Sequence, residues 1–482
     1  MAAIETAGAP GARAHYSEGY KTTVLALLVA AYTFNFIDRT VISTIGQAIK
    51  IDLQLSDTQL GLLGGIAFAL LYTALGIPIA RLAERWSRVN IIAVSIVIWS
   101  GFTAACGLAQ SFLQLLLLRV GVGVGEAGLS PSAHSLISDY YEPRKRASAL
   151  AVYSIGIPLG TMFGAVAGGW LTQAFSWRVA FVIVGLPGVL VALAIKLVIR
   201  EPARGHSEPP PVSAADATPA PPPPFSLLSE MRELGAVAAV LFGKWPVANI
   251  VFGVTIASFA AYGAGAFSPP YFLRAFGLSY TQVGIITGLV AGLSAGIGTV
   301  LGGFLTDRLA RRSARWYALV PAIGLTVAAP IYIAGYLQPT WQISAAILLI
   351  PGIFHYTYLG PTFGVVQNMV DTRRRATATA VLFFFLNLVA LGGGPVFTGW
   401  LIDHLAQGGL DSFKALCPGG AAAPGASAEL ALQCKTTLIK ATRDGIVVTV
   451  CLYVWAGFHY LLGSIGLAQA LAKARAARGE AA

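Results

Sequence analysis

Two charged residues, Arg119 and Glu126, lie in an otherwise apolar and glycine-rich segment, residues 115–135. Their spacing of seven residues is almost two helical turns, so both charges would lie on one helix face, ~10 Å apart along the axis. A charge at bilayer depth costs ~3 kcal/mol or more, and such residues usually face a water-filled cavity or a partner. A structural Arg–Glu pair that locks helices together is the alternative. We favour a role on an ion or substrate path.

The first apolar segment also carries charges, at Asp38 and Arg39. On a helix, Asn35 shares a face with each of them, whereas Asp38 and Arg39 are about 100° apart and cannot point the same way. Counting the helical rise along each span places Asp38 and Arg119 in about the same layer, with Glu126 about two turns nearer the cytoplasm. We therefore predict an ion pair between Asp38 and Arg119, with Arg39 as the alternative partner.

Composition places the chain in a membrane. Of 482 residues, 56% are hydrophobic and 11% are charged, and the mean hydropathy is +0.71. A soluble domain of this size does not need so much apolar surface. Apolar runs long enough to cross ~30 Å of hydrocarbon recur about twelve times. We predict an all-α polytopic membrane protein with spans near 21–48, 58–83, 90–110, 112–139, 147–174, 177–199, 240–273, 280–306, 316–337, 341–369, 376–403 and 443–470.

The net charge of +11 is distributed as in a membrane protein rather than a nucleic-acid-binding protein. Basic residues cluster in alternate connections, at 81–88, 144–146, 308–315, 373–375 and 473–478. The positive-inside rule then places both termini and the central connection in the cytoplasm, at the inner membrane if the chain is bacterial. The first twenty residues lack the apolar core and cleavage site of a signal peptide, so the span after Lys21 should serve as an uncleaved insertion signal.

The two parts of the chain repeat each other. Ser56 and Gln59 have the spacing of a capping box, and the same pair returns 223 residues later. The other matches are Glu84-Arg85 with Asp307-Arg308 (offset 223), 144–149 with 373–378 (offset 229), and Gly169-Trp170-Leu171 with Gly399-Trp400-Leu401 (offset 230). Such duplication is typical of secondary transporters, and predicts two pseudo-symmetric six-helix halves.

The repeat sets the expected domain limits. We predict a cytoplasmic tail (1–20), an N-terminal half (21–200), a Pro-rich cytoplasmic linker (201–235), a C-terminal half (236–470) and a second tail (471–482). The proline run of the linker is expected to be disordered or extended and to act as a spacer.

The acid-Arg motif followed by basic residues, present after the second span and again after the eighth, resembles the signature loop of the major facilitator superfamily. The resemblance covers the whole chain and implies that superfamily's fold. The first copy departs from the usual pattern, with Ala80, Glu84 and Ser87 where Gly, Asp and Gly are expected.

Three further segments look like the spinster branch of that superfamily: 34–39, 125–128 and 158–160. This resemblance implies transport of lysolipids or sphingosine-type lipids, with protons as the driving ion. The Asp-Arg pair of the first span also occurs in organic-anion symporters, which leaves that substrate class open.

The doubled motif also predicts a cytoplasmic gate. Charge pairs at the ends of equivalent helices can meet across the pseudo-two-fold axis and latch the halves when the cavity opens outward. The alternative is that the arginines serve only topology. The candidate gate residues are Glu84, Arg85, Arg88, Asp307, Arg308 and Arg311.

At offset 229, Glu126 corresponds to His355 and Arg119 to Leu348, so charge near mid-membrane is concentrated in the N half. The C half offers aromatic residues, which either pack or form a wall of the cavity. A polar wall facing an aromatic wall suits an amphiphile better than a sugar. The candidate cavity-lining residues are Asn35, Ser130, His134, Tyr153, Tyr262, His355, Tyr356, Phe383 and Asn387.

Cysteine use is sparse. Cys417 and Cys434 lie in the 404–440 connection, outside the cell, where a disulfide is permitted and would contribute ~3 kcal/mol. Their pairing stays open because the sequence does not give their separation. Cys106 and Cys451 lie inside spans and are expected to be buried thiols. No metal-ligand cluster, nucleotide site or nucleophile–base arrangement is apparent, so we expect neither an enzyme nor a cofactor.

Three classes of function remain. The first is a proton-coupled, alternating-access transporter of lysolipid-like amphiphiles, with Asp38 and Glu126 as proton-coupling residues and Arg119 or Arg39 as the partner of substrate charge. The second is a proton-coupled organic-anion or drug transporter. The third, a non-coupled scramblase or receptor, is the least favoured. The expected partners are the lipid bilayer and an amphiphilic small molecule, with the protein as a monomer and no nucleic acid.

Overall fold

The computed structural model describes residues 16–207, 227–371 and 374–477, and these residues form helices and connections with no strand. Twelve helical segments of the described chain are long and apolar enough to cross a membrane. The prediction of an all-α protein with twelve spans is confirmed. Residues 208–226 of the predicted linker, residues 1–15 and 478–482 of the predicted tails, and residues 372–373 lie outside the described residues.

The first half of the chain forms nine helices in the described residues, because several spans consist of two helices in line. They are α1 (Glu18–Asp52), α2 (Asp57–Gly64), α3 (Ile66–Ala83), α4 (Arg88–Cys106), α5 (Phe112–Glu126), α6 (Leu129–Tyr140), α7 (Pro143–Ser154), α8 (Gly156–Ala174) and α9 (Trp177–Val198).

The second half repeats this pattern with additions. Its elements are α10 (Leu227–Phe242), α11 (Trp245–Phe276), α12 (Tyr280–Ala310), α13 (Trp316–Tyr336), α14 (Trp341–His355), η2 (Tyr356–Tyr358), α15 (Leu359–Asn368), α16 (Arg375–Phe384), η4 (Phe385–Leu391), α17 (Gly392–Gly409), α18 (Phe413–Leu416), η5 (Pro418–Gly420), α19 (Ala428–Ser464) and α20 (Leu467–Ala477).

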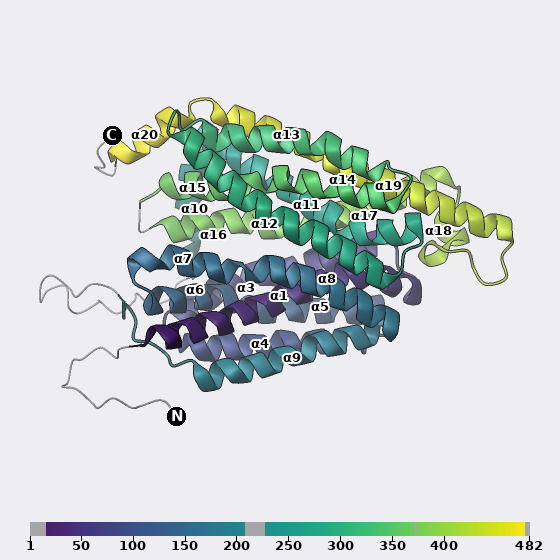
Figure 1. The fold of residues 1–482 in the computed structure, drawn as a ribbon, viewed down its shortest axis with the longest axis horizontal. Helices are drawn as coiled ribbons and strands as arrows, with labels where there is room; N and C mark the ends of the chain where they lie inside the picture. Colours follow the sequence, from purple (N-terminus) through teal and green to yellow (C-terminus); the bar gives the residue numbers. More distant parts are fainter. Residues whose placement is uncertain (1–15, 208–226, 372–373, 478–482) are drawn as a thin grey trace, which may run out of the picture.

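Figure 1 shows the two halves side by side, the N half in purple to blue and the C half in green to yellow. The start of α1 and helix α20 lie at one end of the bundle, on the left, which we call the terminus end. Helix α18 lies at the opposite end, which we call the loop end.

Two boundaries differ from the sequence analysis. The last span was expected at 443–470, but α19 begins at Ala428 and ends at Ser464. Hydropathy did not predict the first part of α19, because this part contains polar residues such as Lys435 and Lys440 and precedes the apolar part of the helix. Residues 227–235, expected in the linker, belong to α10.

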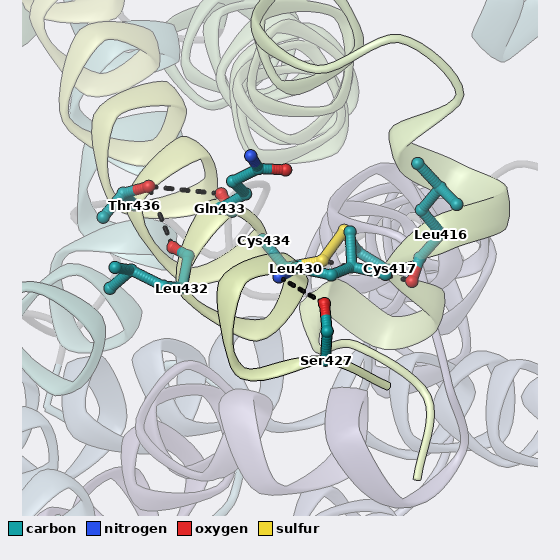
Figure 2. Close-up of a disulfide and its surroundings, with 8 residues drawn as sticks. All are labelled: Leu416, Cys417, Ser427, Leu430, Leu432, Gln433, Cys434 and Thr436. Carbon is teal, nitrogen blue, oxygen red and sulfur yellow. Dashed lines mark hydrogen bonds between the residues drawn. A yellow bond between two sulfur atoms is a disulfide. The ribbon is translucent and has the colours of Figure 1, made fainter. Parts of the chain in front are cut away.

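The extended start of α19 is tied to the connection before it. Cys417 and Cys434 form a disulfide, drawn in Figure 2, between the turn after α18 and the second turn of α19. Of the two other cysteines, Cys106 is buried as expected, whereas Cys451 is exposed on the helix surface.

The internal duplication is visible in equivalent helix ends. Both predicted capping boxes are formed, at Ser56 with Gln59 and at Ser279 with Gln282. Glu126 is the last residue of α5, and its counterpart His355 is the last residue of α14. The offset of 229 residues therefore relates structurally equivalent positions, and each of these spans is interrupted at the same place.

Helices α8 and α12 show how the two halves meet. An idealised Cβ on Gly284 would lie 2.3 Å from a backbone oxygen of α8, one on Gly288 3.1 Å, and one on Gly292 3.5 Å. A Cβ on Gly296, one turn further towards the terminus end, would meet nothing within 4 Å. Because these glycines share one face of α12, the two helices touch at the loop end and diverge towards the terminus end.

Candidate functional site

The N half contains an ion pair in the middle of its bundle. Arg39 on α1 donates from Nε to Oε2 of Glu126 on α5 over 2.7 Å. The Glu126 side chain is fully buried, and that of Arg39 is 18% exposed. Oε1 of Glu126 has no hydrogen-bond partner in the described chain, although the Asn35 amide lies close enough to interact with this carboxylate. The depth argument placed Glu126 about two turns away from Asp38 and Arg119, and it did not predict this pair with Arg39.

The predicted ion pair between Asp38 and Arg119 is not formed. Oδ2 of Asp38 instead accepts a hydrogen bond of 2.6 Å from the hydroxyl of Thr103 on α4, and Oδ1 has no partner among the described residues. Arg119 is 1% exposed, and its Nε and Nη1 also have no partner there. Depth along the axis led to the wrong pairing because it ignores the direction in which each side chain leaves its helix.

Aromatic rings contact the guanidinium groups of Arg39 and Arg119. The Arg39 Cζ lies 4.7 Å from the ring centroids of both Phe68 and Tyr72, and 5.2 Å from that of Phe36. The Arg119 Cζ lies 5.9 Å from the centroid of Phe68, so this ring contacts both cations. Desolvated cation–π contacts contribute about 2 kcal/mol each, which helps to hold guanidinium groups in a site with few hydrogen bonds.

Three further predicted residues lie beside this charge cluster. The ring of Tyr153 stacks on Tyr32 with centroids 4.3 Å apart, and His134 meets Tyr153 edge-on at 5.5 Å. Ser130 lies near the hydroxyls of both tyrosines, although that of Tyr153 has no hydrogen-bond partner in the described chain. The structure therefore groups Ser130, His134 and Tyr153 on the α6–α7 side of the site.

His355 is a packing residue of the C half in this structure. Its Nδ1 lies 2.8 Å from the hydroxyl of Tyr332, and its ring centroid is 4.0 Å from that of Tyr356. Its Nε2 has no partner in the described chain. These contacts are all with tyrosines of the C half and do not reach the charges of the described N half.

Other C-half candidates are more exposed. Tyr262 is 41% exposed and lies close enough to Arg39 to interact with its charge. Phe383 is 44% exposed. Asn387 is partly buried in the π-helical turn η4, a distortion that is frequent at functional sites.

In the described chain, no contact joins Glu84 to Asp307, Arg308 or Arg311 across the halves. Glu84 pairs with Arg81 of its own helix, Nη1 to Oε1 over 2.9 Å. Asp307, Arg308 and Arg311 are exposed, and no hydrogen bond or ion pair joins them to the described part of the N half. The predicted latch is therefore not formed in this structure.

Arg88 has a different position from the other gate candidates. It is buried inside the N half, where it binds Asp139 and, at 2.7 Å, Glu201 in the segment after α9. Burial alone would raise the pKa of Glu201, but hydrogen bonds from the Val89 N–H, Arg88 and Ser87 lower it from its usual value. Arg88 therefore fastens the end of α9 to α4 and α6 rather than latching the two halves.

A second charge cluster, which the sequence analysis missed, joins the halves at the loop end. Asp57 of α2 accepts from Arg274 of α11, Nη2 to Oδ1 over 2.5 Å and Nη1 to Oδ2 over 3.3 Å. Nζ of Lys50 lies 2.5 Å from the same Oδ2. All three side chains are at most 4% exposed. We call Lys50, Asp57 and Arg274 the loop-end interlock.

Further bonds complete the interlock. Nε of Arg274 donates to Gln47 over 2.8 Å, and Nη1 donates to Thr442 over 2.7 Å. No buried nitrogen or oxygen of the three interlock side chains lacks a partner. A buried ion pair is strongly held when each of its polar atoms is satisfied in this way.

Each half also caps a helix of the other. Asp403 of α17 accepts from the backbone N–H groups of Asp57 and Thr58 at the start of α2, over 2.9 and 2.8 Å. Gln173 of α8 accepts from the N–H of Thr281 at the start of α12, over 3.0 Å. Asp403 and Gln173 each lie two residues after the repeated Gly-Trp-Leu motif. The repeat alignment could therefore have predicted that the two residues occupy equivalent positions.

Comparison with known proteins identifies the family. A family model described as the Major Facilitator Superfamily matches residues 28–413, and the chain belongs to this superfamily of transporters. With twelve apolar helices, it is an integral multi-pass membrane protein.

Individual relatives narrow the branch. A solved structure of a bacterial homolog of the human lysosomal transporter Spinster, in an inward-facing and unoccupied conformation, is 36% identical with a TM-score of 0.81, covering 95% of this chain and 99% of that chain. An MFS-type efflux pump of Mycolicibacterium smegmatis is 32% identical over 389 residues, 80% of this chain and 85% of the pump. Human protein spinster homolog 1 is 26% identical over 420 residues, 82% of this chain and 76% of that protein. The chain is a transporter of the spinster-like branch.

Proposed function

We propose that this protein is a proton-coupled transporter that moves a lysolipid-like amphiphile by alternating access. The observation that carries the proposal is Arg119, a fully buried guanidinium with two nitrogens that have no partner in the described chain. Leaving such a group unsatisfied is costly unless a ligand or water completes it. A phosphate headgroup fits, because it accepts two parallel hydrogen bonds from one guanidinium.

The aromatic side chains support an amphiphilic substrate. Tyr262 and Phe383 of the C half are exposed, and Tyr262 lies close enough to Arg39 to interact with its charge. A headgroup bound at the charges of the N half would leave its acyl chain against aromatic and aliphatic surface of the C half.

Two observations support alternating access. The halves touch along α8 and α12 at the loop end and diverge towards the terminus end. The similar spinster homolog is described as inward-facing. We assign the terminus end to the cytoplasm because the basic clusters of the connections lie there. In the opposite state, the loop-end interlock would break and the predicted latch between Glu84-Arg85 and Asp307-Arg308 would form.

Proton coupling is assigned to the two carboxylates. Protonation of Glu126 would remove the charge that holds Arg39, and protonation of Asp38 would remove a nearby negative charge that competes with an anionic headgroup for Arg119. Release of the substrate on the other side would let both carboxylates ionise again.

The test uses purified protein in proteoliposomes with an imposed pH gradient. We expect concentrative uptake of a fluorescent lysophospholipid by the wild type. Glu126→Gln and Asp38→Asn should each lose the dependence of uptake on the pH gradient, while Asp411→Asn, an exposed carboxylate at the loop end, serves as the control. If both variants keep the wild-type pH dependence, the coupling mechanism is wrong.

The relative named as an efflux pump favours one alternative, a proton-coupled drug or organic-anion transporter. A thermal-shift screen of lysophospholipids against sugar acids and cationic drugs separates the two. Stabilisation by drugs or sugar acids alone would support the alternative. Accumulation against a gradient would exclude a non-coupled scramblase.

A further inference from the structure

Thr103 uses its hydroxyl differently from most threonines in the spans. Thr33, Thr255, Thr287 and Thr326, among others, each donate to the carbonyl four residues earlier in the same helix. Thr103 is fully buried and donates instead to the carboxylate of Asp38 on another helix, over 2.6 Å. Its hydroxyl therefore serves the charge cluster and not the local helix.

The position of Thr103 is tightly determined by packing. An idealised Cβ on Gly125 of α5 would lie 2.5 Å from the backbone nitrogen of Trp99, and one on Gly185 of α9 would lie 2.8 Å from that of Ala104. Helices α5 and α9 thus press directly on the backbone of α4 on both sides of Thr103. The hydroxyl cannot follow Asp38 if that side chain turns away.

Asp38 has a competing partner nearby. The charged and titratable groups that face it are Arg39 on its own helix, Glu126 and Arg119 on α5, and Cys106 on α4. Glu126 already binds Arg39. Arg119 retains donors without partners in the described chain, and Asp38 retains an acceptor, Oδ1, without one. A charged pair between them would satisfy both.

We propose that Thr103 is a positioning residue that holds Asp38 against α4 and so keeps Arg119 available for an anionic headgroup. This inference rests on the proposed function, in which Arg119 receives that headgroup. Without the hydroxyl, the Asp38 carboxylate turns to Arg119 and occupies the place of the substrate.

The test measures binding of lysophosphatidylglycerol to the full-length protein in detergent. Thr103→Val keeps the size of the side chain and removes the donor, and its affinity should fall about tenfold, the equivalent of about 1.4 kcal/mol. Thr103→Ser should restore wild-type affinity. Thr44→Val is the matched control, because Thr44 is equally buried and its hydroxyl has no partner among the described residues. If Thr103→Val does not fold, Thr103→Cys, similar in size with a weak donor, takes its place.

A double variant distinguishes positioning from a loss of packing. In Thr103→Val with Asp38→Asn, no carboxylate remains to capture Arg119, so the affinity should return to that of Asp38→Asn alone. The inference is overturned if Thr103→Val binds as well as the wild type, or if the double variant stays as weak as Thr103→Val. Absence of binding to the wild type would instead contradict the proposed function, so the two failures are distinguishable.

Discussion

The charge cluster of the N half and the loop-end interlock are both buried, yet they are satisfied to very different degrees. In the N half, Asp38, Arg119 and Glu126 each retain polar atoms without a hydrogen-bond partner in the described chain. In the interlock, the side chains of Lys50, Asp57 and Arg274 retain none. Because an unsatisfied buried group is costly, the N-half cluster has polar atoms that a ligand could satisfy, as the proposed function requires, whereas the interlock is complete.

The contacts that join the two halves and the proposed substrate site are in different regions of this transporter. The interlock and the two helix caps join the halves, and their bonds stabilise the conformation in which the loop end is closed. The N-half cluster lies within one half, so its bonds can change without moving the halves apart.

The largest effect is expected at the interlock. Asp57→Asn leaves two buried cations without their shared carboxylate, which should lower the free energy of unfolding by about 3–5 kcal/mol or open the loop end. Thermal unfolding in detergent measures the first outcome. Spin-label distances between positions 108 and 337, both at exposed leucines of the loop end, measure the second.

The control for this prediction is Asp52→Asn. Asp52 pairs with Arg178 over 2.5 Å at the same end, but both side chains are more than a third exposed. Such a surface pair contributes about 0–1 kcal/mol. Equal effects of Asp57→Asn and Asp52→Asn would show that burial of the interlock has no energetic consequence.

The disulfide beside the interlock should give the next largest effect. Replacing Cys417 and Cys434 with serine removes a link across 17 residues, which should lower the free energy of unfolding by about 3 kcal/mol. A reductant should lower the melting temperature of the wild type and leave the double variant unchanged. Cys451→Ser, which removes a free cysteine, is the control.

The N-half cluster should respond with the opposite sign. Arg119→Met replaces a buried, poorly satisfied guanidinium with an apolar side chain of similar length. We expect the free energy of unfolding to rise by about 1–2 kcal/mol while lysophospholipid binding is lost. Arg274→Met, in the interlock, should lower it. A fall of similar size in both variants would contradict the contrast between the two regions.

The smallest effect is expected at the helix caps. Asp403→Asn keeps hydrogen-bond acceptors at the start of α2 but removes the negative charge that interacts with the helix dipole, at a cost of about 0.5–1 kcal/mol. High salt should reduce the difference from the wild type. Gln173→Ala, which removes the neutral cap that α8 provides to the start of α12, should show no salt dependence.

Much of this molecule was predictable from one-dimensional patterns. The hydropathy of the chain determined the twelve spans, and the repeats at offsets of 223 to 230 residues determined the equivalence of the halves, down to Glu126 and His355 at equivalent helix ends. The charged residues of the site could be selected for the same reason, because a charge in an apolar run is visible without knowing its neighbours.

Only the tertiary structure decided which groups are partners. The sequence determines how deep Asp38, Arg39 and Arg119 lie along their helices, but the rotation and tilt of each helix depend on packing against the others. These rotations direct Asp38 to Thr103 and Arg39 to Glu126. The interlock could not be predicted from the sequence for the same reason. Lys50, Asp57 and Arg274 stand near the ends of helices, where charges are ordinary in a sequence, and only the approach of α11 to α1 and α2 buries them together.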